Sequence, residues 1–363
     1  MSNAPWTSDQ IRALCLEHGF ARAGVAPAQR SPRAEVLEDW IAAGRHGTMG
    51  WMAEHVDVRS DARRLLDGAK SVICVLDRYA DGASDERESG WGRVARYARG
   101  RDYHVVMKKR LHAVCDRLAE QAPDHQFRAC VDTAPLLERE IAARAGLGGI
   151  GKHTLLIEPG LGSWLLIGSI VTTLELEETG GVEDYDPCGA CTRCIDACPT
   201  DAITPWSVDA RACISALTIE HREPIDEAHH EAMEDWIYGC DVCQEVCPHN
   251  RPTRRTVAAH RHESHDAPVV VEGGRREDGS AFRLIDVLGW DEETRRAAFT
   301  GSAMKRAKLP MMLRNALIAA GNSLRADHDP RLLEAVRTLA GEEMPDMVRE
   351  TARSVLDRLG TRD

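Results

Sequence analysis

The chain has 363 residues, of which 43% are apolar and 29% are charged, and its formal net charge is −12 at pH 7. This length predicts two or three domains with a sizeable buried core, and the acidic balance excludes a general nucleic-acid coat, although a local basic face can still bind a polyanion. No run approaches 18 consecutive apolar residues and the first ten residues lack a secretion signal, so we expect a cytoplasmic protein without membrane contact.

The first 180 residues are predicted to alternate between helices and strands. Helical patterns and caps predict helices over residues 8–18, 103–121 and 135–145. Thr7 or Ser8 caps the first of these helices, and Gly19 ends it. Apolar, β-branched runs predict strands over residues 71–76, 127–131 and 164–171. This alternation is typical of an α/β or α+β fold.

Two further regions follow. Eight of the twelve cysteines lie between residues 188 and 247 and mark a second region over 181–262. The third region is predicted to be all-helical, with helices over residues 310–321, 330–339 and 345–359. Pro310 suits a first helical turn and Gly321 a helix end, and paired helices of this length are typical of a short HEAT-like repeat module. We therefore expect an α+β protein with domains over 1–180, 181–262 and 275–363.

The spacing of the cysteines gives the strongest chemical signal. Residues 188–199 read Cys-x2-Cys-x2-Cys-x3-Cys-Pro, the bacterial ferredoxin run whose fourth cysteine ligates the other cluster. A second run ends at Cys247-Pro and has Ile237 where its first cysteine belongs, which leaves Cys213 as the nearby unassigned thiol. Two 4Fe–4S clusters are predicted, one bound by Cys188, Cys191, Cys194 and Cys247, the other by Cys198, Cys213, Cys240 and Cys243. Zinc is the alternative ligand of such cysteine pairs.

Two other motifs are set aside because their context fails. Residues 146–151 satisfy G-x-G-x-x-G and, with Lys152, nearly complete a phosphate-binding loop. However, a predicted helix rather than a strand precedes them, and His153 stands where that loop needs Ser or Thr. Residues 102–104 begin like a D-x-H-x-x-G cobalamin motif, but Met107 occupies the position of the glycine. The sequence alone therefore assigns no ligand to either motif.

Six segments spread over most of the chain match one known family. They are ARYARGRDYH at 95–104, VDTAPLLER at 131–139, AGLGGIGK at 145–152, CISALTIE at 213–220, YGCDVC at 238–243 and LRNALIAAGN at 313–322. On these residues the chain resembles the epoxyqueuosine reductases, which share their layout with the reductive dehalogenases. Gly149 and His153 depart from residues that are common in the family.

The resemblance implies a cobalamin-dependent oxidoreductase that acts on tRNA. Such an enzyme removes the epoxide oxygen of epoxyqueuosine in the anticodon loop and gives queuosine, the last step of queuosine biosynthesis. The two clusters would pass single electrons to the cobalamin from an external donor such as flavodoxin or ferredoxin. Other functions stay open at this point: a reductive dehalogenase acting on a small organohalide, and an electron-transfer adaptor without chemistry of its own.

The resemblance also implies a set of site residues. Asp132 matches the family's catalytic acid, which protonates the leaving oxygen, and we expect burial to raise its pKa. Its structural alternative is a turn or helix cap before Pro135. Residues expected to bind the cofactor or line its pocket are Arg59, Ala95, Tyr97, Asp132, Arg139, His153, Leu156, Ile167, Ser215 and Asp241.

The basic residues are unevenly distributed despite the negative net charge. Residues 294–325 carry seven Lys or Arg and no acid, which predicts a phosphate-binding face. The residues expected to contact tRNA are Lys305, Arg306, Lys308 and Arg314. Ordinary solvated helix faces are the alternative. We expect the protein to be a monomer.

Overall fold

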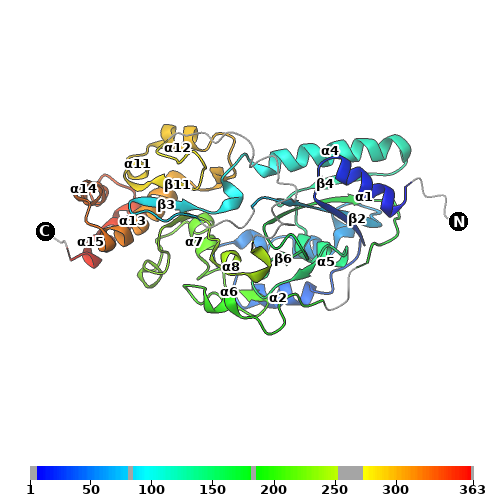
Figure 1. The fold of residues 1–363 in the computed structure, drawn as a ribbon, viewed down its shortest axis with the longest axis horizontal. Coiled ribbons are helices and arrows are strands. Elements are labelled where there is room, and N and C mark those ends of the chain that lie inside the picture. Colours follow the sequence, from blue (N-terminus) through cyan, green and yellow to red (C-terminus); the bar gives the residue numbers. More distant parts are fainter. Residues whose placement is uncertain (1–5, 81–84, 181–184, 252–272, 361–363) are drawn as a thin grey trace.

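The computed structural model describes residues 6–80, 85–180, 185–251 and 273–360. Figure 1 shows a sheet with its covering helices towards the N-terminal end and a group of helices at the C-terminal end, with the cysteine-rich segment between them. This mixture of helices and strands agrees with the expected α+β class. The expected domain boundaries near residues 181 and 262 lie outside the described residues.

The N-terminal sheet has four strands in the order β1-β2-β7-β4, and every neighbouring pair is antiparallel. The strands are β1 (Arg22–Pro27), β2 (Ser71–Arg78), β7 (Leu165–Thr172) and β4 (Phe127–Cys130). Successive residues of β2 point to opposite faces. Ile73 and Val75 pack beneath α1 (Ser8–Glu17) and α4 (Tyr103–Gln121), whereas Val72, Cys74 and Leu76 pack against α5 (Glu138–Arg144). The apolar run of β2 therefore reflects burial on both sides.

Local capping fixes where the two covering helices begin. Thr7 caps α1 and forms a reciprocal capping box with Gln10, which decides between the two predicted caps. Asp102 caps α4 by accepting a hydrogen bond from the backbone N–H of His104 at 3.1 Å. The predicted helix over 103–121 is confirmed at both ends. The first turn of α4 consequently lies beside Asp132, which follows β4.

The G-x-G-x-x-G segment follows α5 and leads into a small hairpin, β5 (Gly149–Ile150) and β6 (Leu156–Ile157). A Cβ on Gly148, whose φ is +136°, would lie 2.2 Å from the carbonyl oxygen of Ile157. These glycines therefore allow close backbone packing, and no helix begins there to bind a phosphate.

A second sheet joins three parts of the chain that were expected to lie in different domains. Its central strand β3 (Trp91–Val94) pairs in parallel with β10 (Trp236–Tyr238) and antiparallel with β11 (Ala281–Arg283). The expectation that the third region is all-helical is therefore wrong at β11. Phe282 lies at the centre of β11 and is fully buried, so the sheet takes up this segment before the helices start.

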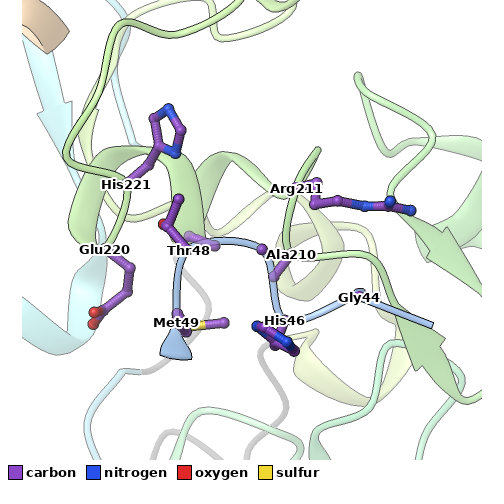
Figure 2. A pocket seen from close by; sticks show the side chains of 10 residues that line it. Gly44, His46, Thr48, Met49, Ala210, Arg211, Glu220 and His221 are labelled. Carbon is purple, nitrogen blue, oxygen red and sulfur yellow. The ribbon is translucent and has the colours of Figure 1, made fainter. Parts of the chain in front are cut away.

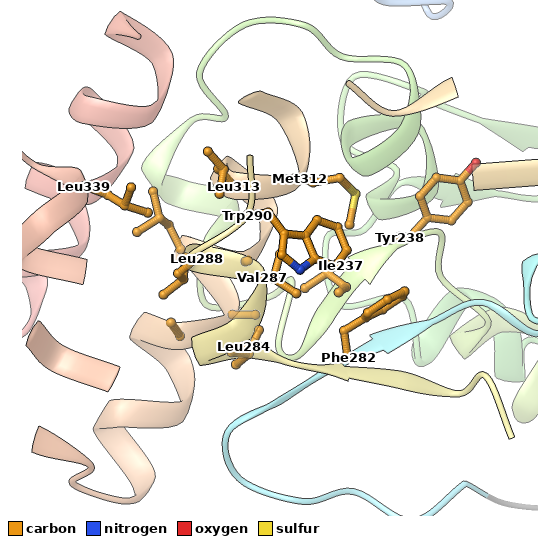
Figure 3. Packing of buried hydrophobic residues seen from close by; sticks show 14 of the residues in the cluster. Ile237, Tyr238, Phe282, Leu284, Val287, Leu288, Trp290, Met312, Leu313 and Leu339 are labelled. Atoms are coloured by element: carbon orange, nitrogen blue, oxygen red, sulfur yellow. The ribbon is translucent and has the colours of Figure 1, made fainter. Parts of the chain in front are cut away.

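The C-terminal helices pack around α13. They are α11 (Leu284–Leu288), α12 (Glu292–Ala298), α13 (Leu309–Ala326), α14 (Pro330–Leu339) and α15 (Asp346–Arg358). Pro310 begins α13 as predicted, but the helix runs past Gly321. A Cβ on Gly321 would lie 2.7 Å from Cγ1 of Val355, so this glycine lets α15 approach rather than ending α13. Figure 3 shows this core, where Trp290 and Met312 meet Phe282 and Ile237 from the second sheet.

The remaining elements are short. The α-helices and strands among them are α2 (Ala34–Ala42), α3 (Val56–Ser60), α6 (Arg193–Asp196), β8 (Ile203–Thr204), β9 (Ser207–Val208), α7 (Ile214–Ile219) and α8 (Val242–Glu245). Single 3-10 turns are η1 (Gly50–Met52), η2 (Ala62–Arg64), η3 (Arg96–Ala98), η4 (Glu227–His229), η5 (Pro248–Asn250) and η6 (Ala303–Arg306). Among the described residues, no helix has the length and apolar character needed to cross a membrane.

Candidate active site

Several of the eight clustered cysteines act on one another's pKa values, which identifies thiols that are neighbours. Burial raises the pKa of Cys194 to about 11, with further contributions from Cys188, Cys247 and Cys191. Burial also raises the pKa of Cys240, and Cys213 and Cys198 contribute to that rise. The pKa of Cys243 is raised in turn by burial and by Cys240 and Cys213. Such mutual effects require these thiols to lie close together. The assignment of each cysteine to one of the two clusters stays a prediction.

Zinc is the alternative to iron–sulfur clusters at these cysteines. A zinc site closes four ligands tightly around one ion. Within the described ranges, no three His, Cys, Asp or Glu side chains converge in that way. The preference for clusters over zinc therefore rests on the ferredoxin spacing of the cysteines. Cys194 also contributes to the raised pKa of Cys243, which is predicted to bind the other cluster. The two predicted ligand sets therefore lie next to each other.

Asp132 lies at the centre of a chain of hydrogen-bonded side chains. It follows β4 with a left-handed backbone (φ +54°), and its N–H donates to Oε1 of Glu138 at 3.0 Å. Its Oδ2 lies 2.9 Å from Nε2 of His104, whose Nδ1 lies 2.7 Å from Oδ1 of Asp102. The Tyr103 ring stacks on His104 with a centroid separation of 4.0 Å, and its hydroxyl hydrogen-bonds Asp132. The first turn of α4 thus supplies the partners of Asp132.

The expected rise in the pKa of Asp132 is wrong. Burial does act to raise this pKa and is the largest single influence, but hydrogen bonds and charge from His104, together with Tyr103 and Arg306, lower it overall. The two carboxylates raise the pKa of His104 to about 9 against the effect of burial. At neutral pH the proton of this trio therefore resides mainly on His104, hydrogen-bonded to Asp132.

Glu138 is the carboxyl group of the site that stays protonated at neutral pH. Burial raises its pKa to about 8, and the negative charge of Asp132 adds to the rise. Asp132 itself is 58% exposed although protein desolvates it strongly. Asp132 therefore meets solvent on one side and His104, Tyr103 and Glu138 on the other, and this partly open surface around Asp132 is called the recess below. A substrate can therefore reach a carboxylate that is surrounded by proton donors.

Three of the predicted cofactor residues lie beside this recess. Arg139 donates from Nη1 to the backbone oxygen of Thr154 at 2.7 Å, and Glu138 and Asp132 act on its pKa. Glu138 also acts on the pKa of Arg59, whose buried Nε finds no hydrogen-bond partner among the described residues. His153 accepts a hydrogen bond from the backbone N–H of Leu155 at Nδ1 (3.2 Å), and within the part of the chain that the structure describes its buried Nε2 has no partner. Because burial lowers the pKa of His153 to about 4, Nε2 carries the proton of a neutral ring.

The other predicted contact residues lie on several elements, and their roles stay predictions. Ala95, Leu156 and Asp241 are buried, whereas Tyr97, Ile167 and Ser215 are partly exposed. Asp132 contributes to the raised pKa of Tyr97, which places that ring near the recess. The Oδ2 of Asp241 accepts hydrogen bonds from the N–H of Arg96 at 2.8 Å and from its Nη1 at 3.2 Å. Asp241 therefore binds an internal partner beside Cys240.

Of the four basic residues expected to contact tRNA, Arg314 is a wrong assignment. Its side chain is fully buried and donates to the backbone oxygens of Leu217, His221 and Glu223 at 2.6–2.7 Å. Arg314 therefore ties α13 to the cysteine-rich segment. By contrast, Lys305, Arg306 and Lys308 are exposed. The positive charge of Lys305 helps to lower the pKa of Asp102, and that of Arg306 helps to lower the pKa of Asp132. This basic face therefore adjoins the recess.

Sequence reasoning missed His104, Tyr103 and Glu138 as site residues. Each belongs to a segment that carries the family resemblance, at 95–104 or 131–139. The motif over 102–104 was set aside because it lacked the glycine of a cobalamin motif. Only the packing of α4 against the end of β4 brings its histidine to Asp132.

A separate pocket of about 320 Å³ lies away from Asp132. Figure 2 shows the loop of residues 44–49 against residues 210–221, with His46, Met49, Glu220 and His221 among the lining side chains. Glu220 also forms an ion pair with Arg306, the residue whose charge helps to lower the pKa of Asp132. The pocket therefore adjoins the basic face beside the recess.

Two family models match parts of this chain. Residues 187–250 match a 4Fe-4S double cluster binding domain, and this segment contains all eight clustered cysteines, Cys213 included. Residues 59–133 match a model described as Epoxyqueuosine reductase QueG, DUF1730, a segment that includes Arg59, His104 and Asp132. The two models therefore cover the cysteine groups and most of the chain of hydrogen bonds around Asp132.

Curated relatives cover most of the chain. An epoxyqueuosine reductase from Xanthomonas campestris is 40% identical over 323 residues, which is 86% of either chain. That of Escherichia coli is 36% identical over 340 residues, covering 92% of this chain and 85% of the relative. A crystal structure of epoxyqueuosine reductase with a tRNA-Tyr epoxyqueuosine-modified stem loop matches 97% of this chain and 90% of its own, with a TM-score of 0.82 and 24% identity. That last match shows a shared fold.

Proposed function

The chain belongs to the epoxyqueuosine reductase family, and we propose that it reduces epoxyqueuosine to queuosine in the anticodon loop of a tRNA. The reaction adds two electrons and two protons, breaks both carbon–oxygen bonds of the epoxide, and yields an alkene and one water molecule. Family membership favours this reaction over dehalogenation of an organohalide and over electron transfer without chemistry.

The observation that carries the mechanism is the chain of hydrogen bonds from Asp102 through His104 to Asp132. An oxygen that leaves carbon as a free alkoxide is a poor leaving group, so it needs a proton as the bond breaks. Asp132 lies at the solvent-reached end of the chain, and His104 behind it holds the proton. As negative charge develops on the oxygen, the proton passes from Nε2 of His104 through Asp132 to that oxygen, and Asp102 keeps the ring in place through Nδ1.

Glu138 is positioned to supply a second proton. Its pKa of about 8 keeps it neutral at pH 7, and it binds the N–H of Asp132. A neutral carboxyl beside the Asp132–His104 pair avoids placing another negative charge next to the developing alkoxide. The site therefore holds both protons that the reaction consumes while Asp132 and Asp102 stay ionised.

We propose cobalamin as the cofactor, on the family resemblance and on the fit of the unpartnered donors. Nε of Arg59 and Nε2 of His153 are buried without an acceptor in the described segments, and cobalamin carries carboxamide and phosphate oxygens that accept such hydrogen bonds. Bound cobalamin would supply reduced cobalt, a strong nucleophile and electron donor. Arg139, fixed by Thr154, would hold one edge of the group or the substrate.

The two 4Fe–4S clusters would deliver electrons one at a time to this site. We assign Cys188, Cys191, Cys194 and Cys247 to one cluster and Cys198, Cys213, Cys240 and Cys243 to the other. A cytoplasmic one-electron carrier such as flavodoxin or ferredoxin would reduce them. We also propose that residues 275–363 form a HEAT-like module that binds tRNA through Lys305, Arg306 and Lys308, and that the protein acts as a monomer.

The decisive experiment is the turnover of an epoxyqueuosine-containing stem loop by the protein loaded with cobalamin and reconstituted clusters. Nucleoside mass analysis should show the loss of one oxygen under reducing conditions. The variant Asp132→Asn should retain bound cobalamin and give no product. The proposal fails if the fully loaded wild-type protein leaves epoxyqueuosine unchanged while a characterised relative reduces it in the same mixture.

A further inference from the structure

An exposed tryptophan lies between two arginines at the edge of the recess. Trp51 is in the 3-10 turn η1, and 41% of its surface is exposed. The guanidinium carbon of Arg59 lies 5.6 Å from the centroid of its ring, and that of Arg306 lies 5.4 Å from it. Both contacts are looser than the 3.9 Å that separates Arg93 from Trp236 in the interior. The indole therefore remains open to another flat group.

The two arginines tie Trp51 to the reacting groups. Arg59 is close enough to Glu138 for that carboxyl to act on its pKa, and Arg306 acts in the same way on Asp132. Arg306 is itself held by Glu220, whose Oε2 accepts from its Nη2 at 2.8 Å. The two arginines come from opposite ends of the chain, so the tertiary fold places this tryptophan at the mouth of the site.

The combination of an open aromatic face and fixed cations suits one class of ligand. Unpaired nucleobases stack on aromatic rings and guanidinium planes, while the adjoining phosphates bind basic side chains. Arg59, Arg306 and the nearby exposed Lys305 supply that positive charge in a protein whose net charge is −12. A protein or lipid partner would need a wider apolar surface, whereas here one ring is surrounded by charge.

We propose that Trp51 stacks on an unpaired base of the tRNA anticodon loop and so positions the loop while the modified nucleoside reaches Asp132. The inference rests on the proposed function, because it takes the substrate to be that loop. It assigns Trp51 to substrate binding rather than to proton transfer or to the cofactor. A stacked base next to the reacting nucleotide would help to hold it out of the loop's own stack.

The test compares Trp51→Ala and Trp51→Phe with Trp206→Ala in the holoenzyme. Trp206 is a matched control, because it is 43% exposed and lies 5.6 Å from the ammonium group of Lys152, on the β8–β9 hairpin. Loss of one stacked base corresponds to a rise of roughly 5- to 150-fold in the Kd of the stem loop. We expect that rise, with a parallel rise in KM, for Trp51→Ala. Trp51→Phe should recover most of it, and Trp206→Ala should bind like wild type.

Three measurements separate the alternatives. Cobalamin content and kcat at saturating stem loop should stay near wild type in Trp51→Ala, since the ring does not contact the reacting atoms. A Kd within twofold of wild type, or a loss of bound cobalamin that parallels the loss of RNA, overturns the inference. If the wild-type protein does not reduce the stem loop, the proposed function is wrong instead. The comparison of Kd values would still decide whether Trp51 binds RNA.

Discussion

Replacing His104 with Gln tests the proton chain most directly. The amide of Gln can still donate a hydrogen bond to Asp132, but it carries no charge and no transferable proton. Asp132 would then lose the partner that does most to lower its pKa, so burial should raise that pKa instead. The variant therefore keeps a hydrogen-bond donor beside Asp132 but removes the proton that His104 can transfer.

The magnitude follows from the pKa of His104. Its rise from 6.5 to about 9 corresponds to roughly 3 kcal/mol of coupling to Asp102 and Asp132, since one pKa unit equals about 1.36 kcal/mol. The side chain is 30% exposed, so solvent screens only part of this coupling. Because the folded pKa is raised, the coupling stabilises the fold fully below pH 6.5 and is lost as the pH rises through 9.

The assay is the single-turnover rate of the loaded enzyme between pH 6 and pH 10. The wild-type rate should fall as Glu138 and then His104 lose their protons, between about pH 8 and pH 9. His104→Gln should be slower at pH 7 by about 10²- to 10⁴-fold, the usual contribution of a general acid, and should lack the inflection near pH 9. His112→Gln, an exposed histidine on the same helix, is the control and should behave like wild type.

One result would refute this reasoning. If His104→Gln turns over within threefold of wild type and keeps the inflection near pH 9, the proton comes from elsewhere. A slower variant that also loses cobalamin would indicate damage to the cofactor site, so bound cobalamin is measured from its absorbance in every sample.

Further predictions concern the buried framework, the basic face and the clusters. Arg314→Leu removes the donor of three backbone carbonyls, of which that of Leu217 is buried, and should lower the free energy of unfolding by about 3 kcal/mol in denaturant titrations. By contrast, Lys308→Glu should keep wild-type stability and weaken stem-loop binding in a salt-dependent manner. Gly321→Ala adds a methyl that must displace Val355 and should destabilise by about 1–3 kcal/mol despite the better helix propensity of Ala; an unchanged melting temperature would contradict the close approach of α15. Cys213→Ser should halve the iron and labile sulfide from about eight atoms of each per chain, and full occupancy would exclude Cys213 as a ligand.

Elements whose signals are local were predictable. The helix over 103–121 and the strand beginning at Ser71 follow from hydrophobic periodicity and β-branched runs within a few turns of chain. Elements that depend on distant partners were not. The short strand β11 exists because its backbone completes a sheet with β3, nearly 190 residues earlier, and Gly321 reads as a helix end until α15 is seen to pack on it.

The basic face shows why composition alone misleads. Seven positive residues without an acid predict a phosphate-binding surface, yet Arg314 faces inward and satisfies backbone carbonyls. A helical pattern cannot distinguish an exposed arginine from one that joins two parts of the fold, because both interrupt the apolar stripe in the same way. The neighbouring Lys305 and Arg306 are exposed because η6 lies at the edge of the helical group.

The sequence by itself predicted a double 4Fe–4S cluster domain, which the family match over residues 187–250 supports, because cluster ligands in ferredoxin runs are set by spacings of a few residues. It also identified Asp132, through its resemblance to one family. Only the tertiary structure decided the ionisation of that carboxyl, since its partner His104 lies 28 residues away on a different element. Burial and charge act through space, so whether an acid holds its proton or passes it on depends on which side chains the fold places around it.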